Sequence, residues 1–209
     1  MCALSYGELS LHAVLELVDE VLAPLRPGDL VVDVGSGVGK LPLLFALLTP
    51  ANGTGVELLQ SRHDVAAAAL AHAHETGLML TTPSRINLAS KVRFVHANAT
   101  AAGAMPRATT HALLSNLCFP RGLTSQLLPL LAAMPRLRTV VSFQPIPPDE
   151  RVYTRRRFSF PERVLPRVAL VPAPPRLVVA SWHDSVPLYV YRVERTAAAG
   201  PQPEGVFVD

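Results

Sequence analysis

The chain has 209 residues, with 49% hydrophobic and 17% charged side chains and a formal net charge of +3. This length corresponds to one domain, and the apolar content excludes a largely disordered chain. No apolar run reaches the roughly 18 residues that a membrane-spanning helix needs. The N-terminus lacks the pattern of a secretory signal, and the two cysteines, Cys2 and Cys118, give no reason to expect a disulfide. We therefore expect a protein of the nucleus or cytoplasm that is not secreted and does not bind membranes.

The first half of the chain alternates between helix-like and strand-like segments. Apolar residues recur at helical spacing between Ser10 and Leu22, and β-branched residues fill the short run Leu30–Val34. Prolines and glycines separate these segments, as expected for short connections. The expected elements are helices over 10–22, 41–48 and 62–75 and strands over 30–34, 54–58 and 92–96.

The second half continues this alternation and then changes character. The expected elements are a strand over 111–117, a helix over 123–131, a strand over 137–143 and an antiparallel pair over 177–182 and 188–194. Between them, the Pro- and Arg-rich segment 145–176 has no clear period and is interpreted as an insertion. Parallel strands covered by helices and closed by a β-hairpin indicate an α/β fold, the seven-stranded Rossmann-like class I methyltransferase sheet. It would form one domain over 1–195, followed by a flexible tail over 196–209.

A glycine-rich loop, Asp33-Val34-Gly35-Ser36-Gly37-Val38-Gly39, joins the first expected strand to the next helix. Glycines there let the backbone approach a ligand at the positive end of a helix. The P-loop pattern fails because Leu41 stands where Ser or Thr is required. The dinucleotide pattern fails because its third glycine comes one residue early. The remaining match is the D-x-G-x-G-x-G motif of S-adenosylmethionine methyltransferases.

A carboxylate, Glu57, ends the second strand 20 residues after Gly37. At this place a carboxylate can accept hydrogen bonds from both ribose hydroxyls of a nucleoside cofactor. The alternative is a tight turn with an exposed glutamate. The loop, its strand context and Glu57 together favour the cofactor site.

Four segments, in order along the chain, resemble one family, the disruptor-of-telomeric-silencing histone H3 lysine methyltransferases, which are non-SET enzymes. The matching segments are Tyr6-Gly7-Glu8, similar to the cofactor lid; Val32–Gly39, similar to the VDLGSGVG loop; Ser115-Asn116-Leu117-Cys118-Phe119, similar to the N-N-F-x-F motif; and Ser181-Trp182 with Pro187 and Tyr189, similar to the final hairpin. Their order and spacing fit across about residues 6–195. The resemblance implies a class I methyltransferase that uses S-adenosyl-L-methionine and modifies a protein lysine, with histone H3 in nucleosomes as the partner.

The same resemblance implies a set of site residues. The cofactor-binding residues are Tyr6, Gly7, Glu8, Asp33, Gly35, Ser36, Gly37, Gly39, Lys40, Glu57, Asn98, Ala99 and Asn116. The catalytic residues are Asn116, Tyr6 and Tyr189, and the residues that line the substrate channel are Phe119, Trp182 and Tyr191. The chain departs from the family at Lys40, Asn98, Ala99 and Ser115, which replace a Gln, an acid, an aromatic residue and an Asn. The Asn98 carbonyl is expected to accept the adenine amino proton in place of the acid.

The chemistry expected at this site is an in-line displacement, which requires alignment of the reacting groups and exclusion of water. An apolar, aromatic-lined channel lowers the pKa of an incoming lysine by desolvation, so no dedicated base is required. Asn116 follows a strand at its carboxyl end, where ligands of α/β proteins bind. The structural alternatives are that Asn116 is a turn residue and that Trp182 and the tyrosines belong to the core. His72 and His74 lie two residues apart on a helix and point in different directions, so no metal site is expected.

The interpretation leaves the substrate open. Arg155, Arg156 and Arg157 can contact phosphate or an acidic histone surface, or simply form a solvated loop. The short chain also allows a methyltransferase of another protein or of a small molecule on the same scaffold. A third alternative is a catalytically silent module that binds the cofactor, which the changes at Asn98 and Ala99 keep open.

Overall fold

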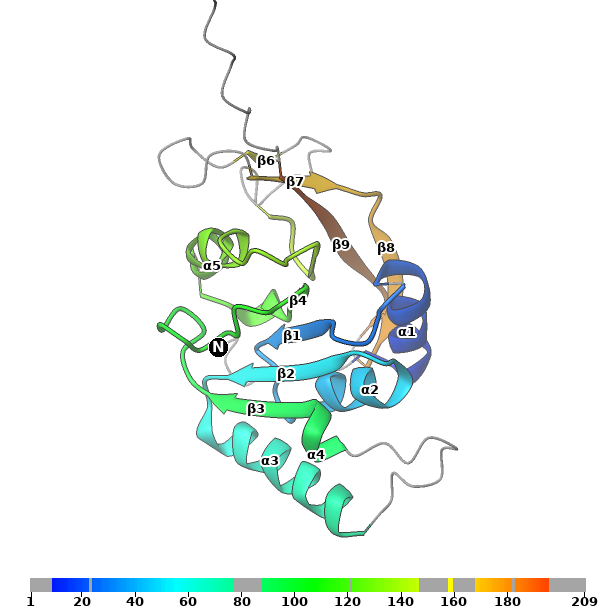
Figure 1. Cartoon of the computed structure of the whole chain (residues 1–209). Coiled ribbons are helices and arrows are strands. Elements are labelled where there is room, and N and C mark those ends of the chain that lie inside the picture. The colour runs from blue at the N-terminus through cyan, green and yellow to red at the C-terminus, as the bar shows by residue number, and fades with distance from the viewer. Residues whose placement is uncertain are drawn as a thin grey trace, which may run out of the picture.

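A computed structural model describes residues 9–22, 24–76, 88–120, 122–146, 158–159, 168–181 and 183–195. Helices and strands alternate along the chain and build one large twisted sheet (Figure 1). The helical segments are α1 (Leu11–Glu16), the π-helical η2 (Leu17–Val21), α2 (Lys40–Leu48), α3 (Gln60–Glu75), α4 (Leu88–Lys91), the 3₁₀ turn η3 (Asn116–Cys118) and α5 (Leu123–Ala132). The strands are β1 (Leu30–Val34), β2 (Asn52–Glu57), β3 (Val92–His96), β4 (His111–Leu114), β5 (Thr139–Ser142), β6 (Phe158–Ser159), β7 (Val168–Pro172), β8 (Arg176–Ala180) and β9 (His183–Arg195).

The sheet has the strand order β3-β2-β1-β4-β5-β9-β7-β6, with β8 paired to β9 off this path. The first five strands are parallel, and β9 runs antiparallel to β5. The carboxyl ends of β1 to β4 therefore meet at one edge of the sheet, and the glycine loop, Glu57 and Asn98 all follow strands at this edge. The predicted α/β, Rossmann-like sheet with an antiparallel C-terminal pair is confirmed.

The predicted count of seven strands is wrong, because the described residues form nine. The two additional strands, β6 and β7, lie in the segment 145–176, where the sequence shows no period. The reason is the length of β9, whose 13 residues pair along their first part with β8 and along their last part with β7. This long strand gives the short apolar run Val168–Pro172 a partner far away in the sequence.

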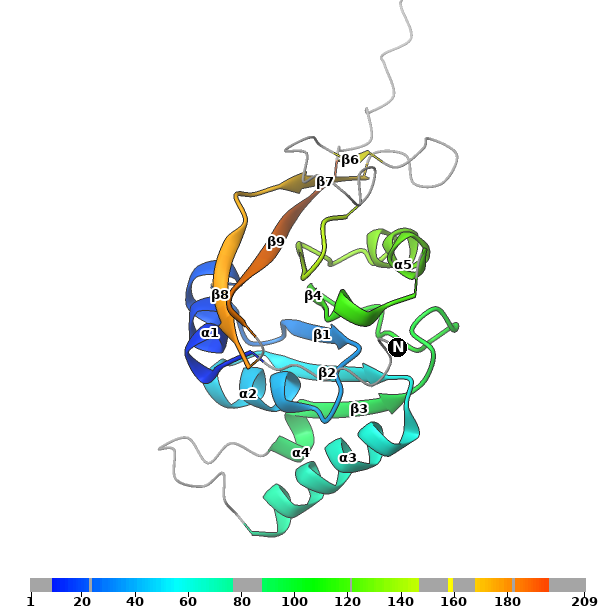
Figure 2. The same cartoon turned by 180° about the vertical axis from the view of Figure 1, so that it is seen from behind.

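Two layers of helices enclose the sheet, as the opposite views in Figures 1 and 2 show. One core cluster joins α1, η2 and α2 to one face of the strands, with Phe45, Leu17 and Leu188 almost fully buried. A second cluster joins α5 to the other face through Leu127 and Leu131. No helix among the described residues has the length and apolar character needed to cross a membrane.

The helix boundaries have local causes. The Ser10 hydroxyl accepts a hydrogen bond from the Ala13 N–H at 3.1 Å and so caps α1. Gly39 adopts a φ of 84°, which allows the sharp entry from the glycine loop into α2. At the other end of α2, the Lys91 ammonium donates to the carbonyls of Ala46 and Thr49 and satisfies carbonyls that the helix leaves unpaired.

Candidate active site

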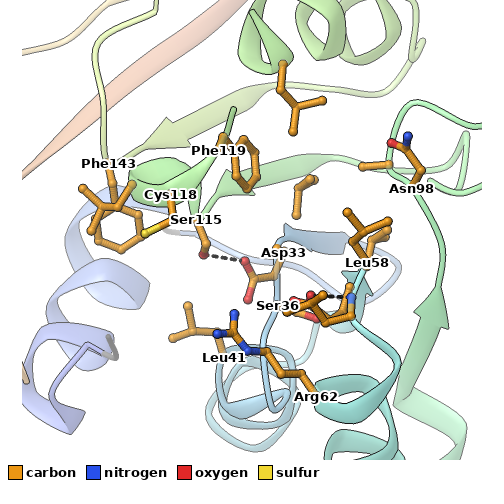
Figure 3. Close-up of a pocket in the computed structure, with 18 of the residues that line it drawn as sticks. Asp33, Ser36, Leu41, Leu58, Arg62, Asn98, Ser115, Cys118, Phe119 and Phe143 are labelled. Atoms are coloured by element: carbon orange, nitrogen blue, oxygen red, sulfur yellow. Dashed lines mark hydrogen bonds between the residues drawn. The ribbon is translucent and has the colours of Figure 1, made fainter. Parts of the chain in front are cut away.

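A cavity of about 590 Å³ opens at the carboxyl edge of the parallel strands (Figure 3). In an open α/β sheet this is the edge where ligands bind. Its lining comes from the glycine loop, the ends of β2 and β3, the turn after β4 and the end of β5. The lining residues are Leu9, Asp33, Val34, Gly35, Ser36, Lys40, Leu41, Val56, Glu57, Leu58, Leu59, Arg62, Ala97, Asn98, Ala99, Ser115, Leu117, Cys118, Phe119, Pro120, Leu123 and Phe143.

The glycine loop is held in place by the strand beside it. The N–H groups of Gly35 and Ser36 both donate to the carbonyl of Val56, at 2.8 and 3.2 Å. Gly35 has a φ of 80°, and a Cβ added to it would lie 2.9 Å from the ring of Phe119. The loop therefore requires glycine at this position. Phe119 lies against it at the wall of the cavity, and its role in a substrate channel stays a prediction.

Glu57 is almost fully buried and is fixed by the backbone. Its Oε2 accepts a hydrogen bond from the Gly37 N–H and its Oε1 accepts one from the Leu59 N–H, both at 2.8 Å. A carboxylate has about four acceptor sites, so each oxygen retains capacity for a further donor. The carboxylate is thus already oriented toward the cavity and can accept hydrogen bonds from two ligand hydroxyls.

Asp33 lies deeper at the same edge, with only 1% of its surface exposed. The Ser115 hydroxyl donates to its Oδ1 at 2.9 Å, a contact drawn in Figure 3. The pKa of Asp33 is raised to about 7, mainly because burial disfavours the charged form; the hydrogen bond from Ser115 lowers this pKa and the nearby charge of Glu57 raises it. A cationic group of a ligand placed beside Asp33 would favour its ionised form.

Asn98 and Ala99 follow β3 and line the cavity, and Asn98 lies at the end opposite Cys118 and Phe143 (Figure 3). The Asn98 carbonyl accepts hydrogen bonds from both the N–H and the hydroxyl of Thr100, at 3.0 and 2.9 Å. Thr100 thus occupies both acceptor sites of the carbonyl that the sequence predicts to accept the adenine amino proton.

Asn116 does not line the cavity, although the sequence predicts it there. It is fully buried, and its Oδ1 accepts hydrogen bonds from the N–H groups of Phe143 and Gln144, each at 3.0 Å. Its Nδ2 donates to the Thr124 hydroxyl over a longer 3.4 Å. The preceding residue, Ser115, lines the cavity instead. These contacts favour a structural role for Asn116, and its catalytic role stays a prediction.

The two tyrosines predicted near the substrate also lie outside the lining. Tyr191 is buried, and its hydroxyl accepts a hydrogen bond from the Ile146 N–H at 2.8 Å. Tyr189 is half-buried and packs with Tyr191 in the cluster on the α5 face. Both belong to the core of the sheet, the structural alternative noted above. Tyr6, Gly7, Glu8, Trp182 and Arg155 to Arg157 lie outside the described residues.

Several lining residues were not predicted. Phe143 directly follows β5, so the rule that ligands bind at carboxyl ends of strands could have found it. Arg62 lies in the first turn of α3 and brings a second cation to the cavity beside Lys40, whose Nζ donates to the Leu9 carbonyl at 3.0 Å. No motif marks Arg62, since its place depends on how α3 packs.

The cavity fits the cofactor that the sequence predicts. Among the described residues, the Ser36 hydroxyl oxygen is the one buried side-chain polar atom that has no hydrogen-bond partner, and Ser36 belongs to the lining. Buried polar atoms usually have partners, so this atom indicates room for a polar ligand group. The polar groups gather around Asp33 and Glu57, whereas Cys118, Phe119 and Phe143 make the far end apolar.

Comparisons with known proteins agree with this geometry. A family model described as "Histone methylation protein DOT1" matches residues 2–189. An RNA methyltransferase from Salinibacter ruber, solved with S-adenosyl-L-homocysteine, is 18% identical at a TM-score of 0.53, with 94% of this chain and 98% of that chain covered. The magnesium protoporphyrin IX methyltransferase from Synechocystis PCC 6803, solved with S-adenosylmethionine, is 15% identical at a TM-score of 0.52, with coverage of 88% and 79%.

A third similar structure is a methyltransferase from Thiobacillus denitrificans, 20% identical at a TM-score of 0.47. The match covers 64% of this chain and about half, 48%, of that one. No curated protein matches the sequence. At these identities the two similarities with TM-scores of 0.53 and 0.52 establish the fold alone.

Proposed function

The chain belongs to the family of the histone methylation protein DOT1, and from this premise we propose that it transfers a methyl group from S-adenosyl-L-methionine to a protein lysine, with histone H3 as the candidate substrate. The observation that carries the proposal is the cavity itself. Its lining combines the two oriented carboxylates, Asp33 and Glu57, and the glycine loop with an apolar end that Phe119 and Phe143 form. The first part suits the cofactor and the second suits the acceptor.

The chain's own residues would hold the cofactor at three places. Asp33 would pair with the methionyl ammonium, and Glu57 would accept hydrogen bonds from the ribose hydroxyls. Lys40 and Arg62 supply positive charge in the same cavity for the methionyl carboxylate. When bound, S-adenosyl-L-methionine supplies an electrophilic methyl group on a sulfonium.

The apolar end prepares the acceptor. Leu117, Cys118, Phe119 and Phe143 desolvate an incoming amine and thereby lower its pKa, because burial disfavours the charged form. Among the described lining residues the only carboxylates are Asp33 and Glu57. Deprotonation of the lysine therefore depends on desolvation and proton loss to water before the amine enters, and the walls exclude water from the reacting groups.

The test is a methyl-transfer assay with radiolabelled S-adenosyl-L-methionine on nucleosomes, free histone H3 and a mixture of unrelated basic proteins. The proposal expects label on a lysine of histone H3, free or in nucleosomes, and much less label with Glu57→Ala at a limiting cofactor concentration. Label on other proteins, or on an added small molecule alone, would overturn the histone assignment. Binding of the cofactor without transfer to any acceptor would identify a silent module.

A second candidate is a methyltransferase of another protein or a small molecule. The observation that favours it is the place of Tyr189 and Tyr191, which pack in the core and leave the acceptor end without the predicted tyrosines. A contact of Arg155 to Arg157 with nucleic acid and a nuclear location stay predictions. The same assay separates the two candidates, because label on other proteins or on an added small molecule alone supports the second.

A further inference from the structure

The amide of Asn98 has a fixed orientation at one end of the cavity. Its Oδ1 accepts two hydrogen bonds from Thr100, one from the backbone N–H at 3.0 Å and one from the hydroxyl at 2.9 Å. A backbone N–H can only donate, so rotating the amide by 180° would place the Nδ2 group, a second donor, against the Thr100 N–H. A carbonyl oxygen offers two lone pairs, and Thr100 uses both.

The group that remains for a ligand is therefore a donor. Nδ2 carries two hydrogens, and no acceptor within hydrogen-bond distance belongs to the part of the chain that the structure describes. Asn98 is exposed at the mouth of the cavity, on the side of β3. Any ligand group that bonds to this side chain must accept a hydrogen bond.

The order of the strands indicates which part of the cofactor lies there. Asp33 belongs to β1, Glu57 ends β2 and Asn98 follows β3, and these strands are neighbours in the order β3-β2-β1. With the methionyl ammonium at Asp33 and the ribose at Glu57, the adenine lies on the β3 side, beside Asn98. Along its outer edge, adenine presents an amino group that donates next to a ring nitrogen, N1, that accepts.

We propose that Asn98 recognises the adenine as a hydrogen-bond donor, through Nδ2 to N1, and contributes nothing to binding of the 6-amino group. This inference rests on the cofactor assignment of the proposed function. It has an unusual consequence, because Asn98→Asp should improve recognition of the amino group. One carboxylate oxygen would retain the bonds from Thr100, and the other would accept from the amino group.

The experiment is a calorimetric titration of the whole chain with two ligands, S-adenosyl-L-homocysteine and its 6-deamino analogue, in which purine replaces adenine. Neither ligand carries the sulfonium, so the charge introduced by Asn98→Asp adds no attraction to that group. Wild type, Asn98→Asp and Asn98→Ala are compared, and thermal melts verify that each variant is folded. A substitution at an exposed side chain of this kind is expected to leave the fold intact.

The expected result is a change in preference between the two ligands. Asn98→Asp raises the preference for S-adenosyl-L-homocysteine over the analogue by about 3- to 10-fold relative to wild type, the value of one hydrogen bond. Asn98→Ala weakens both ligands by a similar factor and leaves the preference unchanged, because the bond to N1 is common to both.

Two results would overturn the inference while leaving the cofactor site in place. One is a preference that Asn98→Asp leaves unchanged or lowers, since the carbonyl of the wild type would then already accept from the amino group. The other is an Asn98→Ala variant with wild-type affinity for both ligands, since the side chain would then not contact the base. If S-adenosyl-L-homocysteine fails to bind the wild type, the proposed function falls together with the inference.

Discussion

Asn116→Ala separates the structural role of this residue from the catalytic role that the sequence predicts. The side chain joins the turn after β4 to the end of β5, because its Oδ1 accepts the N–H groups of Phe143 and Gln144. Truncation removes this acceptor and leaves two donors without their partner. We expect a loss of stability and no change in cofactor affinity per folded molecule.

The magnitude follows from these two contacts. An unsatisfied buried donor costs about 1–3 kcal/mol. The Phe143 N–H also lies 3.4 Å from the Leu114 carbonyl, so it retains part of its bonding, and the Gln144 N–H is only partly buried. We expect a total loss of about 2–4 kcal/mol. For a chain of this size that lowers the melting temperature by about 4–16 °C.

The assay combines thermal and urea unfolding with calorimetric binding of S-adenosyl-L-homocysteine at a temperature where the variant is folded. Two controls bracket the effect. Gln126→Ala, at an exposed position of α5, should change the free energy of unfolding by less than about 0.5 kcal/mol. Thr124→Val removes only the weak 3.4 Å contact to the Asn116 amide and should cost less than Asn116→Ala.

One result would refute this reasoning. If Asn116→Ala melts like wild type and binds the ligand, but loses methyl transfer on an identified substrate, the amide acts in the transfer step. An interaction made only in the transition state gives this signature. The structural role inferred from the contacts to β5 would then be wrong.

Three further predictions concern the cofactor end. Glu57→Ala should weaken S-adenosyl-L-homocysteine at least tenfold in calorimetry, because each bond to a charged acceptor is worth about 1.5–3 kcal/mol; a folded variant with less than a twofold loss would contradict the ribose role. Asp33 has a pKa raised to about 7 in the folded chain, so the native state retains a proton that the unfolded chain has released, and stability falls as pH rises from about 4 to 7. Burial lowers the pKa of His111 to about 4, so this group makes stability rise with pH below its unfolded pKa of about 6.5. Urea unfolding at pH 5 and 8 is therefore compared between wild type and Asp33→Asn, which differ in Asp33 alone. Equal pH dependence of the two proteins would refute the raised pKa of Asp33. Gly35→Ala should reduce ligand affinity at least about fivefold, because the added Cβ would lie 2.9 Å from the ring of Phe119. Gly103→Ala is the control for backbone strain alone, since Gly103 has a similar φ of 79° and open space around it. Equal effects of the two changes on affinity would refute the role of the close contact.

The sequence predicted the parallel part of the sheet well. The strands over 30–34 and 92–96 have the predicted bounds, and the helices over 41–48, 62–75 and 123–131 differ from α2, α3 and α5 by one or two residues. Their signals are local, since β-branched runs, helical spacing and glycine or proline breaks all lie within a few residues. Strand β7 has only the short apolar run Val168–Pro172 as a local signal, and it depends on partners in β9 that lie 19 to 27 residues farther along the chain.

The place of Asn116 outside the cavity lining has a similar cause. The sequence predicts a strand over 111–117, but β4 ends at Leu114 and the chain turns into η3. In a strand, alternate side chains share a face, whereas a 3₁₀ turn rotates successive residues by about a third of a turn. Ser115 therefore reaches the cavity and Asp33, while Asn116 turns toward the end of β5.

The residues at the two ends of the cavity are positioned by different kinds of contact, and this difference decides which of them a sequence motif can predict. At the cofactor end, Glu57 is fixed by N–H groups of the glycine loop and of Leu59, so residues that act together lie within about one β-α-β unit. At the acceptor end, Phe143 is positioned by Asn116, 27 residues away, and the apolar wall comes from two different strand ends. A one-residue shift of the turn after β4 would exchange the residues that face the acceptor, while the hydrogen bonds of Glu57 to the glycine loop and to Leu59 stay in place. Members of one fold can therefore share a cofactor loop and differ in acceptor, and the substrate must be determined from the acceptor end.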